Sequence, residues 1–280
     1  MAIVGMGLIG GSLAKALQGR CARLAGIDRD PEVIRMALVD GVIAEGVAAL
    51  DALSVPPDVI LLAIPVSGIL ETLRNLPEQI TGEAVIMDVG STKREIVTEM
   101  DRLPERFDPI GGHPMCGKET GGYILSEAGL FQDAVFALTP LARSKDRAQY
   151  FATALVQALG ARALWLDADT HDRAVAHTSH LPYLLANLLA GITPDAAAGL
   201  AGPGFSSTTR LAPTPPDMMQ DVLRTNRDNL LSSIYTFQTR LAAAVELLEQ
   251  GQIEGLVGQL QAGAQQYHHI QSLRTKRNVL

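Results

Sequence analysis

Cysteine, long apolar runs and positive charge are all scarce in this 280-residue chain, and each scarcity excludes a class of protein. The two cysteines, Cys21 and Cys116, cannot build a disulfide framework and suit a reducing compartment. No stretch approaches the roughly 18 consecutive apolar residues that a membrane-spanning helix needs. The formal net charge of −7 argues against a nucleic acid as partner, whereas an anionic small molecule needs only local positive charge.

The first residues show no signal-peptide pattern, because Met1 to Val4 lead straight into a strand and a glycine turn. We therefore expect a cytoplasmic protein with no membrane partner. The chain contains no internal repeat and no low-complexity tract.

The first half of the chain alternates short apolar runs with helical stretches. Almost continuously apolar runs are typical of strands that are buried on both faces of a parallel sheet. A helix is expected at about 146–158, between the last two strands. This alternation favours an α/β fold with a Rossmann-type doubly wound sheet. The predicted strands are 2–4, 24–27, 59–64, 84–87, 134–138 and 161–166.

After Asp167 the strand signals stop and long helical patterns take over. We therefore predict a dinucleotide-binding domain at 1–167 and an all-helical domain for substrate binding and dimerisation at 168–280. One long helix is expected at 217–249 and another at about 252–272, with more apolar surface than so small a domain covers alone, which favours a homodimer. Apolar residues recur every three or four positions along the first of these helices, at Leu230, Ile234, Phe237, Leu241, Val245 and Leu248.

A glycine-rich turn follows the first strand at once, in the order Gly5-Met6-Gly7-Leu8-Ile9-Gly10, and opens an apolar helix. In such a turn the first glycine bends the chain tightly and the second admits a pyrophosphate. The third lets helix and strand pack closely, so that the helix N-terminus faces the phosphates. The expected cofactor-binding residues are Gly5, Gly7, Leu8, Ile9, Gly10, Asp28, Arg29, Pro65 and Ser91.

An acid ends the second strand, 18 residues past Gly10, where it can bind a ribose diol. This acid, Asp28, would repel a 2′-phosphate and so favours NAD over NADP. The neighbouring Arg29 could accept that phosphate, so NADP stays open as an alternative.

Two further motifs narrow the chemistry. Residues 88–93 (Asp-Val-Gly-Ser-Thr-Lys) end a strand and begin a helix, and residues 110–117 hold a histidine between glycines that permit close approach of a ligand. Both segments lie where open α/β sheets bind ligands, which makes Ser91 and His113 candidate catalytic residues. Ser91 could instead be only a helix N-cap, and Cys116 is expected to be a small buried filler and not a nucleophile. His177 and His180 share a helical face but lack a third ligand, so no metal is expected.

At these motifs the chain resembles the prephenate/arogenate dehydrogenase family, whose patterns look like D-x-x-S-x-K and G-x-H-P-x-x-G. The resemblance continues through residues 178–182 (Thr-Ser-His-Leu-Pro) and 205–212 (Phe-Ser-Ser-Thr-Thr-Arg-Leu-Ala) and covers essentially the whole chain. It implies an NAD-dependent oxidative decarboxylation of prephenate in tyrosine biosynthesis, with arogenate as the alternative substrate.

The same resemblance implies roles for individual residues. His113 would accept the hydroxyl proton of a small anionic cyclohexadiene substrate while hydride leaves for the nicotinamide. Ser91 would orient that histidine and the hydroxyl, and Arg210 would bind a substrate carboxylate. The remaining expected substrate contacts are Ser179, His180 and Tyr183.

Four positions depart from the family pattern and leave the choice between prephenate and arogenate open. Tyr183 stands where a second histidine is frequent, and Met219 where a tryptophan is frequent. Ser207 replaces an acid, and Lys118 replaces a threonine. All four bear on substrate recognition and not on hydride chemistry.

Two other functions compete with this interpretation. A β-hydroxyacid dehydrogenase has a similar layout but uses a helical lysine as its acid/base group, and this chain has no lysine between Lys145 and Lys276. A non-catalytic NAD sensor would keep the glycine turn but would not need Ser91, His113 and Arg210 together.

Overall fold

The computed structural model describes residues 1–118 and 120–276, and the chain divides into two units, Met1–Leu230 and Leu231–Leu280. The first unit holds the whole sheet and the helices as far as the start of α10. The second consists of the rest of α10 and α11.

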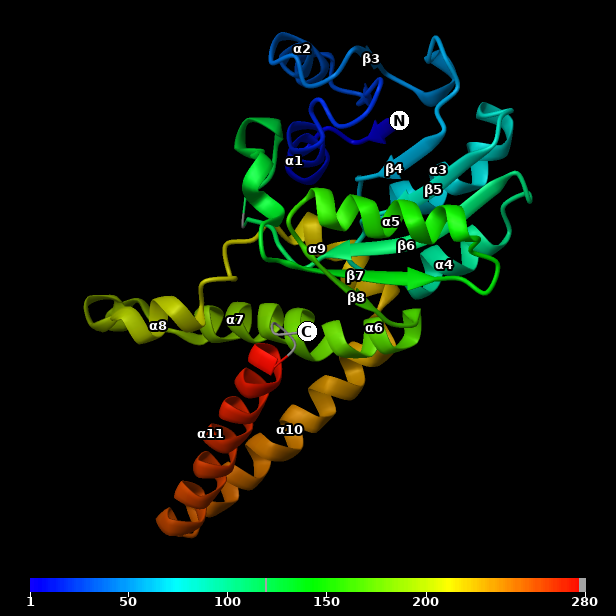
Figure 1. Cartoon of the computed structure of the whole chain (residues 1–280). Coiled ribbons are helices and arrows are strands. Elements are labelled where there is room, and N and C mark those ends of the chain that lie inside the picture. Colours follow the sequence, from blue (N-terminus) through cyan, green and yellow to red (C-terminus); the bar gives the residue numbers. More distant parts are fainter. Residues whose placement is uncertain (119, 277–280) are drawn as a thin grey trace. The chain divides into compact units, whose positions relative to one another are not determined.

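The sheet of the first unit has eight strands in the order β3-β2-β1-β4-β5-β6-β7-β8 (Figure 1). Neighbours pair in parallel from β3 to β6, β7 pairs antiparallel with β6, and β8 is again parallel to β7. The chain moves outward from β1 to β3 and then returns to place β4 on the other side of β1, so a topological switch point lies between β1 and β4. The Rossmann-type prediction is confirmed. The strands are β1 (Ala2–Val4), β2 (Ala25–Ile27), β3 (Glu45–Val47), β4 (Val59–Leu62), β5 (Ala84–Asp88), β6 (Phe107–Pro114), β7 (Val135–Pro140) and β8 (Arg162–Trp165).

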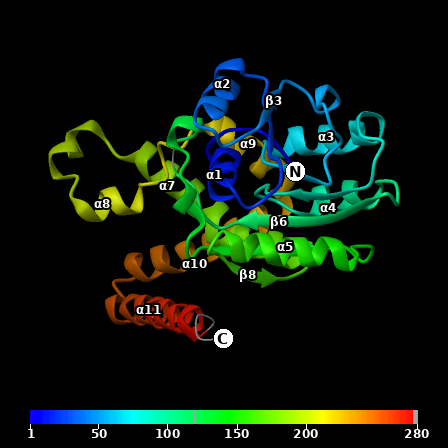
Figure 2. The ribbon, with the colours of Figure 1, turned by 45° about the horizontal axis from the view of Figure 1, so that its top comes forward.

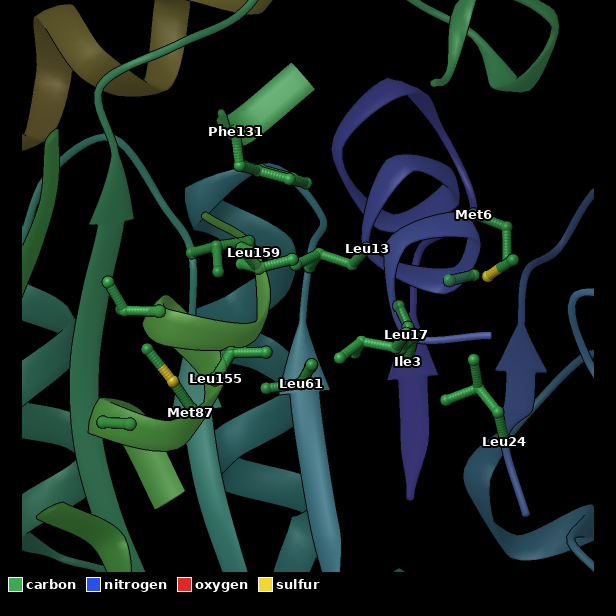
Figure 3. Close-up of a cluster of buried hydrophobic side chains, with 14 of the residues drawn as sticks. Ile3, Met6, Leu13, Leu17, Leu24, Leu61, Met87, Phe131, Leu155 and Leu159 are labelled. Carbon is green, nitrogen blue, oxygen red and sulfur yellow. The ribbon is translucent and has the colours of Figure 1, made fainter. Parts of the chain in front are cut away.

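Two apolar clusters sandwich the sheet, because successive strand residues face opposite sides. Ile3 and Leu61 join a cluster with residues of α1 and α5, which Figure 3 shows, whereas Ile60 and Leu62 join a cluster with residues of α3 and α4. Burial on both sides explains why these strands are apolar throughout. The helices that surround the sheet are α1 (Leu8–Ala16), α2 (Pro31–Val39), α3 (Val66–Gln79), α4 (Arg94–Asp101) and α5 (Asp146–Ala158).

Strands β3 and β6 have no counterpart among the predicted strands. β6 contains Pro109 and two glycines, which are poor strand formers by propensity. The packing requires both glycines, because a Cβ on Gly112 would lie 2.6 Å from the Cε of Met87, and one on Gly111 would collide with the Oγ1 of Thr139. His113 therefore lies on a strand in the middle of the sheet.

Beyond β8 the described part of the chain is helical or irregular, as predicted. α6 (Ala168–Val175) continues through a π-helical turn, η4 (Ala176–His180), into α7 (Leu181–Ile192), and α8 (Pro203–Thr208) and α9 (Pro216–Thr225) follow. Single 3₁₀ turns complete the unit: η1 (Leu50–Ala52), η2 (Tyr123–Leu125), η3 (Ala128–Phe131) and η5 (Asp195–Leu200).

The prediction of a single helix at 217–249 is wrong, because the helix is interrupted at Asn226, between α9 and α10 (Arg227–Glu249). Asn226 has φ −123° and ψ 28°, outside the helical region. Its side chain is buried and donates a hydrogen bond to the backbone oxygen of Asp172. This contact offsets the loss of regular helix geometry.

The second unit pairs α10 with α11 (Ile253–Lys276), which corresponds to the helix predicted at 252–272. Gln259 donates a hydrogen bond to the backbone oxygen of Arg240 at 3.0 Å. Leu230, expected with the interface residues, is instead buried within the chain itself. Within the described residues, no helix is long and apolar enough to cross a membrane. Large apolar side chains remain exposed on both helices, namely Tyr235, Phe237, Leu241, Val245, Leu248, Ile253, Val257, Leu260, Tyr267, Ile270 and Leu273.

Candidate active site

The turn between β1 and α1 has the shape that a dinucleotide phosphate requires. Gly5 has φ +88°, a left-handed conformation that glycine adopts without strain, and a Cβ at Gly10 would collide with the carbonyl oxygen of Gly5. A Cβ at Gly7, by contrast, would meet nothing within 4 Å. Gly7 caps α1 without a side-chain hydrogen bond, so backbone N–H groups of the first helical turn are available to an anion.

A cavity of about 560 Å³ lies beside this turn at the switch point of the sheet. Five of the nine residues predicted to bind the cofactor line it, namely Gly5, Gly7, Asp28, Arg29 and Pro65. Leu8, Ile9 and Gly10 form the first turn of α1, directly after Gly7. The residues that line the cavity therefore surround the glycine turn and the acid that follows β2.

The carboxylate of Asp28 is held in place at the end of β2. Its Oδ2 accepts a hydrogen bond from the backbone N–H of Met6 at 2.8 Å, and its Oδ1 accepts one from Asp30 at 3.0 Å. The side chain thus faces the glycine turn, where a ribose would lie next to a bound pyrophosphate. Arg29 beside it is exposed.

His113 lies on β6, one strand beyond the end of β5, and its side chain is partly buried. Its Nδ1 lies 2.9 Å from Nε2 of His171 on α6, and the two rings meet edge to face with centroids 5.1 Å apart. A histidine from the sheet is therefore joined to a histidine from the first helix of the helical region.

Asp172 continues this chain of contacts. Its Oδ1 lies 2.8 Å from Nδ1 of His171 and also accepts a hydrogen bond from the backbone N–H of Lys93 at 2.8 Å. Its Oδ2 accepts one from the backbone N–H of Arg94 at 3.0 Å. Asp172 thus fixes the first residues of α4 and the ring of His171 at the same time.

His180, at the end of the π-helical turn η4, is 1% exposed and belongs to the same cluster. Its Nδ1 lies 3.2 Å from Nδ2 of Asn226, which also donates to the backbone oxygen of Asp172 at 2.7 Å. π-Helical turns occur frequently at functional sites, since the extra residue redirects a side chain. The contact between Asn226 and His180 therefore joins the break between α9 and α10 to the π-helical turn η4.

A fully buried ion pair lies under the histidines. Lys93 Nζ pairs with the carboxylate of Asp88, which also accepts hydrogen bonds from the backbone N–H groups of Gly90 at 2.8 Å and Gly112 at 3.3 Å. Burial raises the pKa of Asp88 and lowers the pKa of Lys93. This pair ties the end of β5 to the residue before His113.

The electrostatics of the cluster favour the neutral forms of His113 and His180. Burial, together with the nearby His171, Lys93 and His180, lowers the pKa of His113 well below its ordinary value. Burial also lowers the pKa of His180 to about 4. Burial by itself would raise the pKa of Asp172, but hydrogen bonds from His171 and from two backbone N–H groups outweigh it and lower that pKa. Near pH 7 the cluster therefore holds a carboxylate beside a neutral His113 that can accept a proton.

The other predicted site residues lie in different surroundings. Ser91 follows β5 and is partly exposed, and the hydrogen bond of His113 goes to His171 in its place. Ser179 precedes His180 in η4 and is half-buried. Tyr183 is buried on α7, with its hydroxyl 3.5 Å from the backbone oxygen of Thr214.

Arg210 is exposed in the turn after α8. Figures 1 and 2 both draw α8 at the far end of α7 from the sheet. The contact between Tyr183 and Thr214 ties this turn to α7 one helical turn beyond His180.

Two further predictions concern groups near His113. Cys116 packs against the apolar core, and burial raises the pKa of its thiol to about 11, which fits a filler and not a nucleophile. Among the residues that the structure describes, no group of three or more His, Cys, Asp or Glu side chains could hold a metal ion.

Four residues of the cluster escaped the sequence analysis: Lys93, His171, Asp172 and Asn226. The adjacent His171 and Asp172 offered little signal, because neighbouring residues on a helix do not ordinarily face each other. Asn226 offered none, since it lay inside what reads as one helix. Only the packing of α9 and α10 reveals its contacts.

Comparison with known proteins connects this geometry to a family. The chain is 30% identical over 264 residues to a prephenate dehydrogenase of Bacillus subtilis, covering 91% of this chain and 71% of the relative. The structure of a prephenate dehydrogenase from A. aeolicus, in complex with hydroxyphenyl propionate and NAD⁺, is similar with a TM-score of 0.87 and 28% identity, over 96% of this chain and 97% of that one. A Synechocystis arogenate dehydrogenase is similar with a TM-score of 0.82 and 28% identity, over 96% and 99%.

Family profiles match almost the whole chain in two adjoining parts. Residues 13–165 match the nucleotide-binding domain of prephenate dehydrogenase, and residues 167–262 match its dimerization domain. The nucleotide-binding match begins near the end of α1 and covers the strands from β2 to β8, and the second match includes His171, His180 and Asn226. With the resemblance at four motifs, these matches show that this chain is an oxidoreductase that belongs to the prephenate dehydrogenase family.

Proposed function

We propose that the chain catalyses the NAD-dependent oxidative decarboxylation of prephenate to 4-hydroxyphenylpyruvate, as a step of tyrosine biosynthesis. One observation carries the proposal: His113 lies on β6 next to β5 and is in hydrogen-bond contact with His171, which in turn contacts Asp172. Arogenate, which differs from prephenate in its side chain, is the alternative substrate. The likeness to an arogenate dehydrogenase supports keeping it in the test.

The cavity residues fit NAD. The open space at Gly7 and the uncapped N-terminus of α1 suit a pyrophosphate, and the fixed carboxylate of Asp28 suits a ribose diol. When bound, the nicotinamide supplies the acceptor for hydride. The substrate would then lie between that ring and the histidine cluster.

His113 is the proposed general base. Because its pKa is held well below the ordinary histidine value, its neutral form is available near pH 7. It takes the proton of the 4-hydroxyl as the carbon that bears this hydroxyl loses hydride. The ring carboxylate leaves as carbon dioxide, its bonding electron pair completes the aromatic ring, and the phenolate oxygen takes the proton back from His113. The protein contributes placement and a proton acceptor, while aromatisation drives the reaction.

The remaining predicted residues have proposed roles in binding. The ring of His180 accepts at Nδ1 from Asn226, which leaves its Nε2–H to donate to the substrate. Ser91 would orient the 4-hydroxyl, and Arg210 would bind a carboxylate. Ser179 and Tyr183 adjoin His180 on the same helical run and would shape the pocket.

We propose that residues 1–167 bind the dinucleotide and that residues 168–280 bind substrate and form a homodimer. The match of residues 167–262 to a dimerization domain supports the second part. The expectation of a cytoplasmic enzyme stays a prediction.

The test is a direct assay of the purified chain with NAD and prephenate, and separately with NAD and arogenate, followed by NADH absorbance. Turnover of prephenate at the higher kcat/KM supports the proposal. Turnover of arogenate alone moves the assignment to the alternative substrate. Absence of turnover with either one, by protein that binds NAD, would refute both.

Cofactor choice gives a first prediction. We expect kcat/KM to favour NAD over NADP by at least about tenfold, roughly 1.4 kcal/mol, because the carboxylate of Asp28 would face the 2′-phosphate. Arg29→Ala should lower kcat/KM for NADP more than for NAD, since only NADP has a 2′-phosphate that this exposed arginine could accept. Equal turnover with NADP, lost in Arg29→Ala, would show that Arg29 decides the preference.

Assembly gives a second prediction. Phe237→Glu together with Leu241→Glu should convert the homodimer to a monomer, because two charges would enter an apolar surface that is 37% and 54% exposed at these residues. Thr239→Glu, on the opposite side of α10, is the matched control and should stay dimeric. Light scattering at micromolar concentration measures the mass. A wild-type monomer under these conditions would remove the proposal of a dimer.

A further inference from the structure

The proposed reaction uses His113 as the base, whereas the buried His171 and Asp172 take no part in its chemical steps. His171 is 1% exposed and Asp172 is not exposed, so both are shielded from solvent. We infer that Asp172 and His171 form a relay that fixes the tautomer of His113, with hydrogen on Nδ1 and the lone pair of Nε2 directed to the substrate. The tautomer is a property of the free protein, whereas its consequence for turnover rests on the proposed function.

The relay begins at a group that can only accept. The Asp172 carboxylate accepts hydrogen bonds from the backbone N–H groups of Lys93 and Arg94, which can only donate. Its pKa is lowered by the hydrogen bonds that it receives, which outweigh burial, so it has no proton to give near neutral pH. The contact of 2.8 Å with His171 therefore requires the hydrogen to sit on Nδ1 of that ring.

The second ring follows from the first. In the relay, His171 has its one ring hydrogen on Nδ1 and presents a lone pair at Nε2. Nδ1 of His113 lies 2.9 Å away and must donate to this lone pair. The remaining nitrogen of His113, Nε2, is then the acceptor that a general base needs. Without the relay the two tautomers of His113 would be free to exchange, and the form with hydrogen on Nε2 could not accept a proton there.

The neighbouring His180 has the opposite tautomer, which its contact with Asn226 fixes. Asn229 donates to Oδ1 of Asn226 at 2.8 Å, which orients the amide so that Nδ2 points to Nδ1 of His180. His180 thus accepts at Nδ1 and carries hydrogen on Nε2. The two histidines offer the site one acceptor and one donor, which matches a hydroxyl that must both lose a proton and remain oriented.

Charged groups surround His113 on several sides. His171 and Asp172 face it from α6, His180 from η4, and Lys93 from the segment before α4, with Asp88 paired to Lys93 beneath. Arg94 adjoins Asp172 through its guanidinium at 3.5 Å. When His113 takes a proton at Nε2, its Nδ1–H stays with His171, and the new positive charge lies two hydrogen bonds from the Asp172 carboxylate. This is the arrangement by which a buried acid orients and stabilises an imidazolium without itself becoming protonated.

The first arm of the test is nitrogen NMR of the ligand-free protein labelled with ¹⁵N-histidine, at pH 7.5. The His113 signals, assigned by their loss in His113→Asn, should show a protonated Nδ1 and an unprotonated Nε2. In His171→Leu the fixed tautomer should give way to a mixture. In His171→Gln, whose amide oxygen can accept from Nδ1, the wild-type pattern should largely return.

The second arm is steady-state kinetics with NAD and the preferred substrate. His171→Leu should lower kcat by about tenfold or more with KM nearly unchanged, and His171→Gln should recover part of the loss. His177→Asn is the matched control, because it removes an exposed histidine from the same helical run and should leave both constants unchanged. Thermal unfolding checks that each variant is folded.

The two arms separate the relay from the proposed function. A wild-type His113 with hydrogen on Nε2, or a tautomer that His171→Leu does not disturb, would overturn the relay whatever the enzyme turns over. A kcat for His171→Leu within twofold of wild type would also overturn it. The expected tautomers in a protein that oxidises neither substrate would leave the relay standing and refute the proposed function.

Discussion

His113→Asn is expected to bind NAD with wild-type affinity and to lose about 10²–10⁴ in kcat, the usual contribution of a positioned general base. Asparagine can keep a polar contact with His171, but its amide cannot accept a proton near neutral pH. The cavity that surrounds Gly7 and Asp28 is formed by other elements, so the cofactor site should stay intact. Titration of cofactor fluorescence and steady-state kinetics measure the two quantities. A variant within a few-fold of wild type would remove His113 as the base.

The pH dependence of the wild-type enzyme provides an independent check on the same residue. Burial and neighbouring groups lower the pKa of His113 well below its ordinary value, so the neutral base persists from neutral into mildly acidic solution. The rate of the free enzyme should therefore fall only when the pH drops below the usual titration range of histidine, and the fall should follow loss of the neutral form. In His113→Asn this acid limb should vanish from the residual activity. An acid limb of unchanged position in the variant would assign it to another group.

Arg210→Ala is expected to raise KM for the substrate by about 30-fold or more, with the NAD dissociation constant nearly unchanged. Removal of the guanidinium leaves a bound carboxylate without its charge-assisted partner, a loss on the order of 2–4 kcal/mol in a desolvated site. The turn that holds Arg210 is tied to α7 through Tyr183 and Thr214, one helical turn from His180, whereas Arg210 is not among the residues that line the cofactor cavity. Initial rates over a range of substrate concentrations measure the effect.

Two companion variants sharpen the result for Arg210. Arg210→Lys should recover only part of the loss, since an ammonium cannot reproduce the planar fork that binds a carboxylate through two hydrogen bonds. Arg147→Ala removes an arginine at the opposite, amino-terminal edge of the sheet, where it donates to the backbone oxygen of Asp58, and should leave KM unchanged. A weaker NAD affinity in Arg210→Ala, with an unaltered substrate KM, would mean that this residue serves the cofactor.

The sheet could be predicted from sequence wherever burial leaves a composition signal. β1, β4 and β5 are covered on both faces, so nearly every residue in them is apolar, and the pattern is unambiguous. β6 gives no such signal, because the close approach of β5 and β7 demands glycine where a strand ordinarily has branched residues. Strand pairing, which is a contact between distant segments, decides its conformation.

In the helical region, too, contacts between distant segments limit what the sequence predicts. Apolar spacing continues across residue 226, so periodicity alone predicts one helix over 217–249. The break arises because the buried Asn226 side chain bonds to Asp172 and His180, which are 54 and 46 residues away in sequence. Proteins often give up regular secondary structure at functional sites, where side chains from distant segments meet.

The candidate site, too, could be predicted from the sequence only in part. Local motifs carried His113 and the glycine turn, since each requires particular residues at fixed spacing. The pair of His171 and Asp172 is adjacent in sequence but acquires its meaning only when α6 packs beside β6, which no local pattern reveals. The absence of lysine between Lys145 and Lys276 separated the chain correctly from β-hydroxyacid dehydrogenases, because that absence is itself a sequence property.

The central claim is that one active site couples hydride removal to the loss of carbon dioxide, with His113 as the proton acceptor. The most direct measurement is the stoichiometry of the two products, with NADH followed by absorbance and ¹⁴CO₂ trapped from substrate labelled in the ring carboxylate. The wild-type enzyme should release one carbon dioxide for each NADH, and His113→Asn should slow both by the same factor. Formation of NADH without labelled carbon dioxide, or a variant that slows one product and not the other, would contradict the account.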